Sequence, residues 1–64
     1  MQEIFASSAS LAGILNLVNS FYYSTTKTLE IHSENVWAIK NQNGTYCSTY
    51  VIKKKGRYKF VNQL

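Results

Sequence analysis

The densest group of side chains that could do chemistry lies near the C-terminus, where five of the seven cationic residues fall within residues 53–59. They are Lys53, Lys54, Lys55, Arg57 and Lys59, with Tyr58 between the last two. Clustered cations gain affinity for a polyanion by releasing its counterions. The run therefore predicts a loop that contacts phosphate or an acidic protein surface. The alternative is a solvated turn whose lysines prevent edge-to-edge pairing of the sheet.

Groups that could support catalysis are few. Cys47 is the only thiol and His32 the only imidazole, and the chain contains no Asp. A nucleophilic site needs a nucleophile, a base and an orienting group held together, whereas these two residues belong to expected strands that a third strand separates. Glu30 and Glu34 flank an expected turn, and the three glycines form no phosphate-binding loop. We expect no catalytic residues, no metal site, no cofactor and no small-molecule substrate.

Size and charge limit the possible classes further. The chain has 64 residues, a mass of 7.3 kDa and a formal net charge of +4, which predicts a single domain over residues 1–64 with a marginal core. One cysteine allows no internal disulfide. No charge lies between Glu3 and Lys27, but the possible span Ile4–Tyr23 contains six serines and asparagines and is too polar for a typical membrane span. We expect a cytoplasmic protein without a membrane role.

An amphipathic helix is predicted at about residues 8–23. Leu11, Ile14, Leu15 and Val18 recur at the spacing of one helical face, and Ser8 or Ser10 is suited to the N-cap. The opposite face is polar without charge and includes Asn16, Asn19, Ser20 and Tyr23. Such residues permit close approach without burying charge, so this face is a candidate surface for self-association. The alternative is an ordinary exposed polar face.

Alternating patterns after Lys27 predict strands at about 27–33, 36–41, 45–53 and 57–62. Asn43–Gly44 is the typical sequence of a two-residue type I′ turn, and Lys54–Gly56 fits a three-residue loop with glycine in the left-handed conformation. The expected fold class is α+β. One N-terminal amphipathic helix would pack on a three- to four-stranded antiparallel meander, in the order α-β-β-β-β.

These turns predict the register of the sheet. Trp37 would lie opposite Tyr50, and Tyr50 opposite Phe60. One face would then carry Trp37, Ile39, Tyr46, Tyr50, Ile52, Tyr58 and Phe60, either as the core under the helix or as a platform on which bases stack. The first hairpin has two alternatives. A loop at Ser33–Asn35 adds Leu29 and Ile31 to this face and is favoured, whereas a two-residue turn would move Ile31 to the other face.

The run Val36-Trp-Ala-Ile-Lys-Asn-Gln-Asn-Gly-Thr-Tyr46 resembles a pattern in short, uncharacterised proteins of bacteriophages and mobile elements. In those proteins a strand ending in Ile-Lys-Asn meets an x-x-Gly-x-Tyr turn. The resemblance covers less than half of the chain and carries over no functional residue. It implies a phage-type accessory protein, a class that commonly binds and inhibits host machinery, including defence nucleases.

Three functions follow from these features. The leading hypothesis is a non-enzymatic inhibitor that binds a host protein or complex, such as a nucleic-acid-processing complex or, as anti-CRISPR proteins do, a CRISPR complex. The second is a nucleic-acid-binding module that uses the basic residues 53–59. The third is a homodimeric structural protein that associates through the uncharged helix face.

Overall fold

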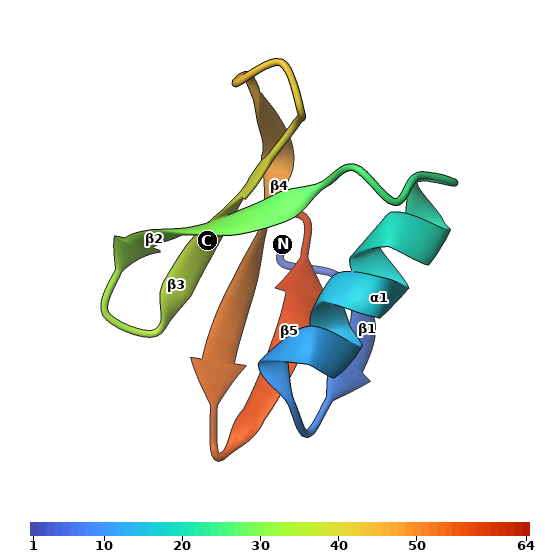
Figure 1. Cartoon of the computed structure of the whole chain (residues 1–64). Coiled ribbons are helices and arrows are strands. Elements are labelled where there is room, and N and C mark those ends of the chain that lie inside the picture. The colour runs from blue at the N-terminus through green and yellow to red at the C-terminus, as the bar shows by residue number, and fades with distance from the viewer.

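A helix and five strands make up the computed structural model, which describes all residues 1–64. In chain order these are β1 (Ile4–Ser8), α1 (Leu11–Phe21), β2 (Thr28–Ser33), β3 (Val36–Lys40), β4 (Tyr46–Lys54) and β5 (Arg57–Val61). The strands form one antiparallel sheet of order β1-β5-β4-β3-β2, and α1 lies against its β1–β5 side (Figure 1). The α+β class is therefore confirmed.

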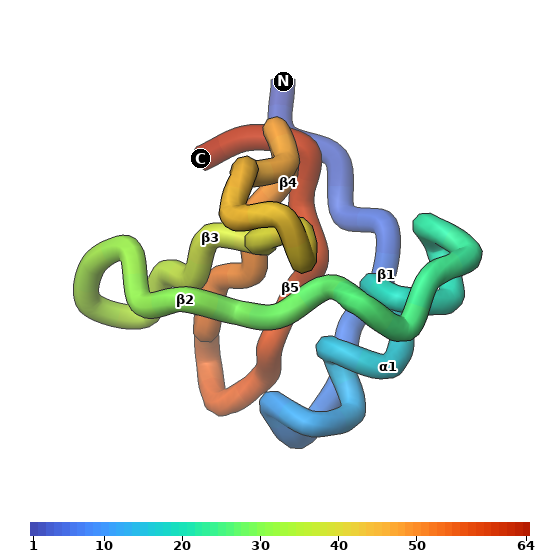
Figure 2. Tube along the Cα trace, turned by 45° about the horizontal axis from the view of Figure 1, so that its top comes forward, coloured from blue at the N-terminus to red at the C-terminus, as the bar shows by residue number.

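The expected three to four strands are too few, because β1 was not predicted. β1 pairs with β5, so the two ends of the chain lie side by side (Figure 2). Beyond the ladder, three hydrogen bonds join these ends: the Asn62 N–H donates to the Glu3 carbonyl at 3.2 Å, the Glu3 N–H donates to Asn62 Oδ1 at 2.7 Å, and Gln2 Nε2 donates to the Gln63 carbonyl at 3.0 Å. No local turn connects these segments, and the sequence pattern that identifies hairpins therefore cannot detect this pair.

The helix is shorter than predicted and is capped at the expected serine. Ser10 is the N-cap, with its Oγ accepting from the Gly13 N–H at 3.0 Å, while Ser8 belongs to β1. Ile14 and Val18 are fully buried, and they pack with Ile39, Val51 and Phe60 of the sheet. With 11 residues α1 is too short to span a bilayer, and the structure contains no other helix.

The turn between β3 and β4 differs from the expected type I′ turn. The Asn41 N–H donates to the Thr45 carbonyl at 2.7 Å, and the Gly44 N–H donates to the Asn41 carbonyl at 3.0 Å. Only Gly44 has a positive φ (93°), whereas a type I′ turn would need one at Asn43 as well. The loop therefore spans three residues, 42–44. An irregularity in the register follows it, so β4 is not aligned as predicted.

The turn between β4 and β5 is also one residue different from the prediction. Lys54 lies opposite Arg57, which leaves a two-residue loop of Lys55 and Gly56 instead of a three-residue one. Both loop residues have positive φ, 52° and 77°. This is the type I′ arrangement, with lysine at a position where asparagine or glycine is usual.

The two wrongly predicted turns lie at the two ends of β4. As a result, the side chains of β4 point to the opposite faces of the sheet from those expected. Val51, not Tyr50, lies opposite both Trp37 and Phe60. Trp37, Ile39, Tyr58 and Phe60 still share the face that α1 packs on, as predicted. The register moves the rest of the predicted bulky face, Tyr46, Tyr50 and Ile52, to the far face of the sheet.

The first hairpin has the favoured register, but its turn spans only Glu34 and Asn35 and not the expected three residues, because a β-bulge compensates for the shorter turn. Ile31 lies opposite Trp37 and Leu29 opposite Ile39, so both side chains belong to the face of α1. A β-bulge after Ile31 then leads into the turn, where Asn35 has a φ of 59°. The helix does not reach this end of the sheet, and Ile31 remains 79% exposed.

Candidate functional site

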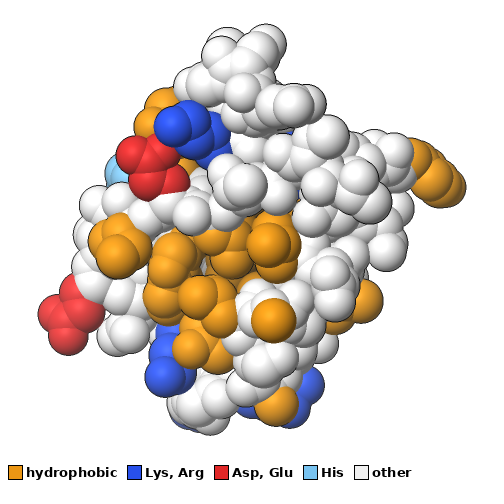
Figure 3. All heavy atoms as spheres, viewed as in Figure 1, with side chains coloured by type: hydrophobic (Ala, Val, Ile, Leu, Met, Phe, Trp, Pro, Cys, Tyr) orange, Lys and Arg blue, Asp and Glu red, His pale blue; other side chains and the backbone are white.

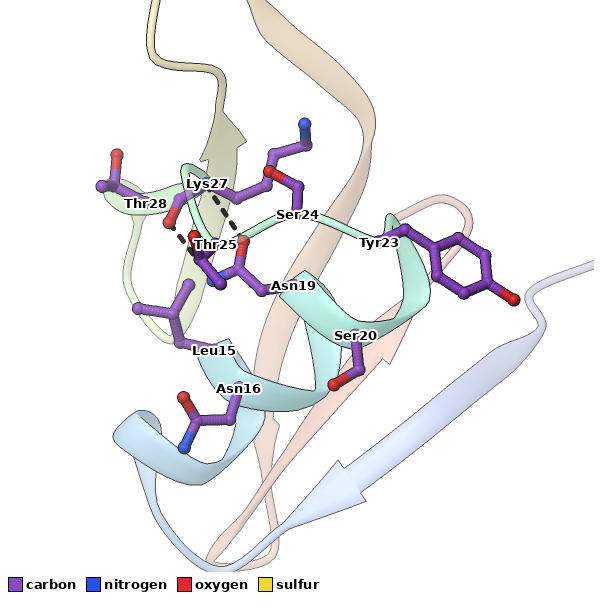
Figure 4. A pocket seen from close by; sticks show the side chains of 9 residues that line it. All are labelled: Leu15, Asn16, Asn19, Ser20, Tyr23, Ser24, Thr25, Lys27 and Thr28. Carbon is purple, nitrogen blue, oxygen red and sulfur yellow. Dashed lines mark hydrogen bonds between the residues drawn. The ribbon is translucent and has the colours of Figure 1, made fainter.

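A shallow groove of about 970 Å³ runs between the outer face of α1 and the segment that follows it (Figure 4). The residues that line it are Leu15, Asn16, Asn19, Ser20, Tyr23, Ser24, Thr25, Lys27 and Thr28. All four residues that the sequence singled out for self-association belong to this groove. The polar segment 24–28 was not singled out from the sequence, since Lys27 and Thr28 were expected only to begin a strand.

Asn19 shapes this groove by binding the backbone of the segment across from it. Its Oδ1 accepts from the Lys27 N–H at 3.0 Å, and its Nδ2 donates to the Lys27 carbonyl at 3.5 Å. Within the same segment, the hydroxyl groups of Ser24 and Thr26 form a hydrogen bond, with their oxygens 2.7 Å apart. The amide of Asn19 is thus committed to the protein, whereas Asn16 and Ser20 are exposed.

Tyr23 ends the helix in a conformation that is unfavourable for a bulky residue. The Tyr23 N–H donates to the Ser20 carbonyl at 3.1 Å and the Ser24 N–H to the Asn19 carbonyl at 2.7 Å. This is a Schellman motif, in which glycine usually occupies the left-handed position. Tyr23 occupies it with a φ of 53° while its side chain is 99% exposed and points away from the protein (Figure 4).

The basic hairpin, residues 53–59, distributes its cations over both faces of the sheet. Lys53 lies on the face of α1, with its Nζ 5.3 Å from the ring centre of Tyr58. On the far face, Arg57 Nε donates to Ser7 Oγ at 3.0 Å and Lys59 pairs with Ile52. Lys54 and Lys55 are exposed at the tip. None of the five cations forms a salt bridge, since the only one joins Lys40 and Glu30.

An apolar patch remains open on the face of α1, beyond the edge of the helix. It consists of Leu29, Ile31, Trp37 and Tyr58, and the rings of Trp37 and Tyr58 lie 5.5 Å apart. Figure 3 shows orange side chains gathered between α1 and β2 on this side of the molecule. The sequence suggested either a core under the helix or a base-stacking platform for the whole bulky face, and it gave no sign that the helix would cover only part of it.

The far face carries a small polar network. Tyr46 Oη donates to Glu30 Oε2 at 2.7 Å, and Lys40 Nζ lies 3.6 Å from the same oxygen. The hydrogen bond from Tyr46, and then the charge of Lys40, lower the pKa of Glu30. The same hydrogen bond raises the pKa of Tyr46, because ionising the phenol would lose it. These groups stabilise one another and form no acid–base pair near neutral pH.

The only thiol and the only imidazole have separate surroundings. Cys47 Sγ donates to Asn41 Oδ1 at 3.7 Å, and the thiol packs beside the core. The ring of His32 lies 5.6 Å from that of Tyr50. No group of three His, Cys, Asp or Glu residues is placed to hold a metal ion.

Comparison with known proteins adds no relative. No protein-family model, no curated protein and no solved structure matches the chain.

Proposed function

We propose that the chain is a small, non-enzymatic binding protein that docks on a partner protein through the groove beside α1. Tyr23 is the observation that carries this proposal. A non-glycine residue in the left-handed region costs on the order of 1 kcal/mol, and no contact within the chain offsets this cost because the side chain is 99% exposed. Tyrosine is also among the residues that most often dominate protein interfaces.

The chemistry of the groove favours a protein over a nucleic acid at this surface. Its lining consists mainly of amides and hydroxyls, which can pair with a partner backbone without desolvating a charge. Lys27 is the single charged residue of the lining, and its Nζ lies 5.0 Å from the ring centre of Tyr22, within cation–π range.

A phage-type accessory protein that acts stoichiometrically on a host protein or complex fits this surface. The resemblance of residues 36–46 to short phage and mobile-element proteins motivates this choice of partner. The separate environments of Cys47 and His32 support a non-catalytic mode of action. Inhibition would then come from occupying a surface that the host complex needs.

Site-specific photocrosslinking tests the proposal. A benzophenone amino acid replaces Tyr23 in one variant and the exposed Tyr46 of the far face in a matched control, and both are irradiated in host lysate. We expect a discrete adduct from position 23 only. Excess wild-type protein and excess Tyr46→Phe should suppress this adduct, whereas excess Tyr23→Gly should not. Equal labelling at both positions, or equal competition by Tyr23→Gly, would contradict docking through the groove.

A second function, nucleic-acid binding by the basic hairpin, is supported by Lys55. This lysine occupies a left-handed turn position that suits asparagine or glycine better, and it is exposed. The backbone therefore gains nothing from lysine, while a phosphate ligand would gain a contact. The five cations, free of salt bridges, could contact several phosphates.

Fluorescence anisotropy with single- and double-stranded DNA and RNA tests this second function. If all five cations contact a single strand, the log–log slope of affinity against salt should be about −3.5. Exchange of Lys53, Lys54 and Lys55 for glutamate should abolish binding. Lys55→Asn should weaken the slope by about 0.7, whereas Lys27→Asn, with the same net charge, should leave it unchanged. No binding at low salt would remove this function.

A further inference from the structure

The two edges of the sheet are protected to very different degrees. β1 forms one edge, where a register irregularity lies between Ile4 and Ala6 and α1 packs alongside. Both features hinder the addition of another strand. β2 forms the other edge, and five of its six residues are exposed. It contains no proline or lysine, and its own β-bulge lies only at its end, between Ile31 and Ser33.

The side chains of β2 also offer contacts to a further strand. Ile31 is 79% exposed at the border of the apolar patch. Glu30 is the only carboxylate in the strand, and both its hydrogen bond with Tyr46 and its salt bridge with Lys40 involve Oε2. The second carboxylate oxygen, Oε1, can therefore accept another hydrogen bond.

Antiparallel pairing of β2 with a second copy keeps each side chain on its own face when it centres on a residue, such as Leu29, Glu30, Ile31 or His32. Centring on His32 would set Glu30 opposite Glu34 of the second copy, which is unfavourable. Centring on Glu30 sets two glutamates directly opposite each other, which is destabilising. Centring on Leu29 sets Ile31 opposite Lys27 of the second copy. Centring on Ile31 places the two Ile31 side chains opposite each other, and it places Glu30 of each copy opposite His32 of the other. The register about Leu29 also makes an apolar pair, Leu29 with its own copy, but it leaves the exposed Ile31 opposite a lysine. The register about Ile31 pairs this exposed side chain with itself and gives each Glu30 an imidazole partner.

We infer that β2 is a homodimerisation edge, at which two copies pair antiparallel about Ile31 to form one ten-stranded sheet. The occupant of this edge is thus a second copy of the chain. Its imidazole N–H donors would face the Glu30 carboxylates, and the two apolar patches would become continuous across the seam. This interface lies outside the α1 groove and differs from the self-association that the sequence suggested through Asn16, Asn19, Ser20 and Tyr23.

Sedimentation equilibrium from about 1 µM to about 1 mM tests the association by mass action. The wild-type mass should rise from 7.3 kDa toward twice that value. Ile31→Lys should keep the single-chain mass throughout, whereas Gln42→Lys, with the same charge in an exposed loop, should behave like the wild type. Circular dichroism checks that both variants fold. A wild type that stays at 7.3 kDa, or an Ile31→Lys protein that still doubles, would overturn the inference.

Disulfide trapping tests the register. In a Cys47→Ser background, Ile31→Cys would place two thiols directly opposite each other, within the range for a disulfide. Ser33→Cys is the matched control on the same strand, since Ser33 lies beyond the β-bulge and would not face its own copy. Oxidation should crosslink the first variant at least about tenfold faster. Equal crosslinking rates would overturn pairing about Ile31. The substitution His32→Glu should weaken the association, because it sets a second carboxylate opposite each Glu30, and an unchanged association would also overturn this register.

Discussion

The two halves of the sheet contain similar apolar residues but differ in what covers them. The half that carries α1 contains three fully buried strand residues, with Phe60 and Val51 beneath the helix and Val61 on the far face. Ile39 is the only fully buried residue of β2 and β3. A helix is about 10 Å wide and strands lie about 4.8 Å apart, so one helix covers about two strands. A chain with five strands and one helix therefore leaves sheet surface for other contacts. Stability comes from the covered half, and we assign the proposed homodimer to the open one.

The largest test of this difference compares two apolar truncations. Phe60→Ala removes a buried ring that contacts Phe5 and Phe21, and it should cost about 3–5 kcal/mol. Ile31→Ala removes an exposed side chain and should change monomer stability by no more than about 0.5 kcal/mol. Urea denaturation at low protein concentration measures both. Comparable losses would mean that the open half contributes to the monomer core.

Two tyrosine hydroxyls of equal hydrogen-bond length give the next comparison. Tyr22 Oη and Thr49 Oγ1 lie 2.7 Å apart, and Thr49 is buried. Tyr22→Phe leaves that hydroxyl without its partner and should cost about 1–1.5 kcal/mol. Tyr46→Phe breaks the exposed bond to Glu30 and should cost less. Denaturant midpoints measure both losses of stability. A larger loss for Tyr46→Phe would contradict the conclusion that the covered half of the sheet provides most of the stability.

Tyr23→Gly should act in the opposite direction and stabilise the fold by about 1 kcal/mol, because glycine adopts a left-handed conformation without strain. Asn35→Gly is the control, since Asn35 has a similar φ of 59° but asparagine already tolerates it. Thermal unfolding should therefore show a larger gain for Tyr23→Gly. No gain would mean that the tyrosine is unstrained, and the argument for its role in binding would lose its basis.

The smallest expected effect is on pH dependence. The lowered pKa of Glu30 means that its bond with Tyr46 adds stability above the unfolded pKa and loses it as the pH falls through the folded value. The raised pKa of Tyr46 removes the same contribution in strong alkali. The stability difference between wild type and Tyr46→Phe should therefore shrink from pH 6 to pH 3. A difference that stays constant would exclude this linkage.

Much of the fold follows from local chemistry. The apolar spacing of α1, its cap at Ser10 and the pairing of Ile31 with Trp37 were predictable because each depends on residues within one turn or hairpin. Among the site residues, the cations of residues 53–59 and the uncharged face of α1 were also evident in the sequence. Their grouping on particular faces was not.

Long-range packing decided the rest. β1 pairs with a strand 50 or more residues away, and no sequence pattern marks such a contact. Lys55 and Tyr23 take left-handed conformations that their residue types disfavour, and the first of these shifts a register by one residue. Because side chains alternate along a strand, one such shift reverses a whole face. The burial of Val51 and the exposure of Ile31 therefore depend on how the strands and helix meet in three dimensions.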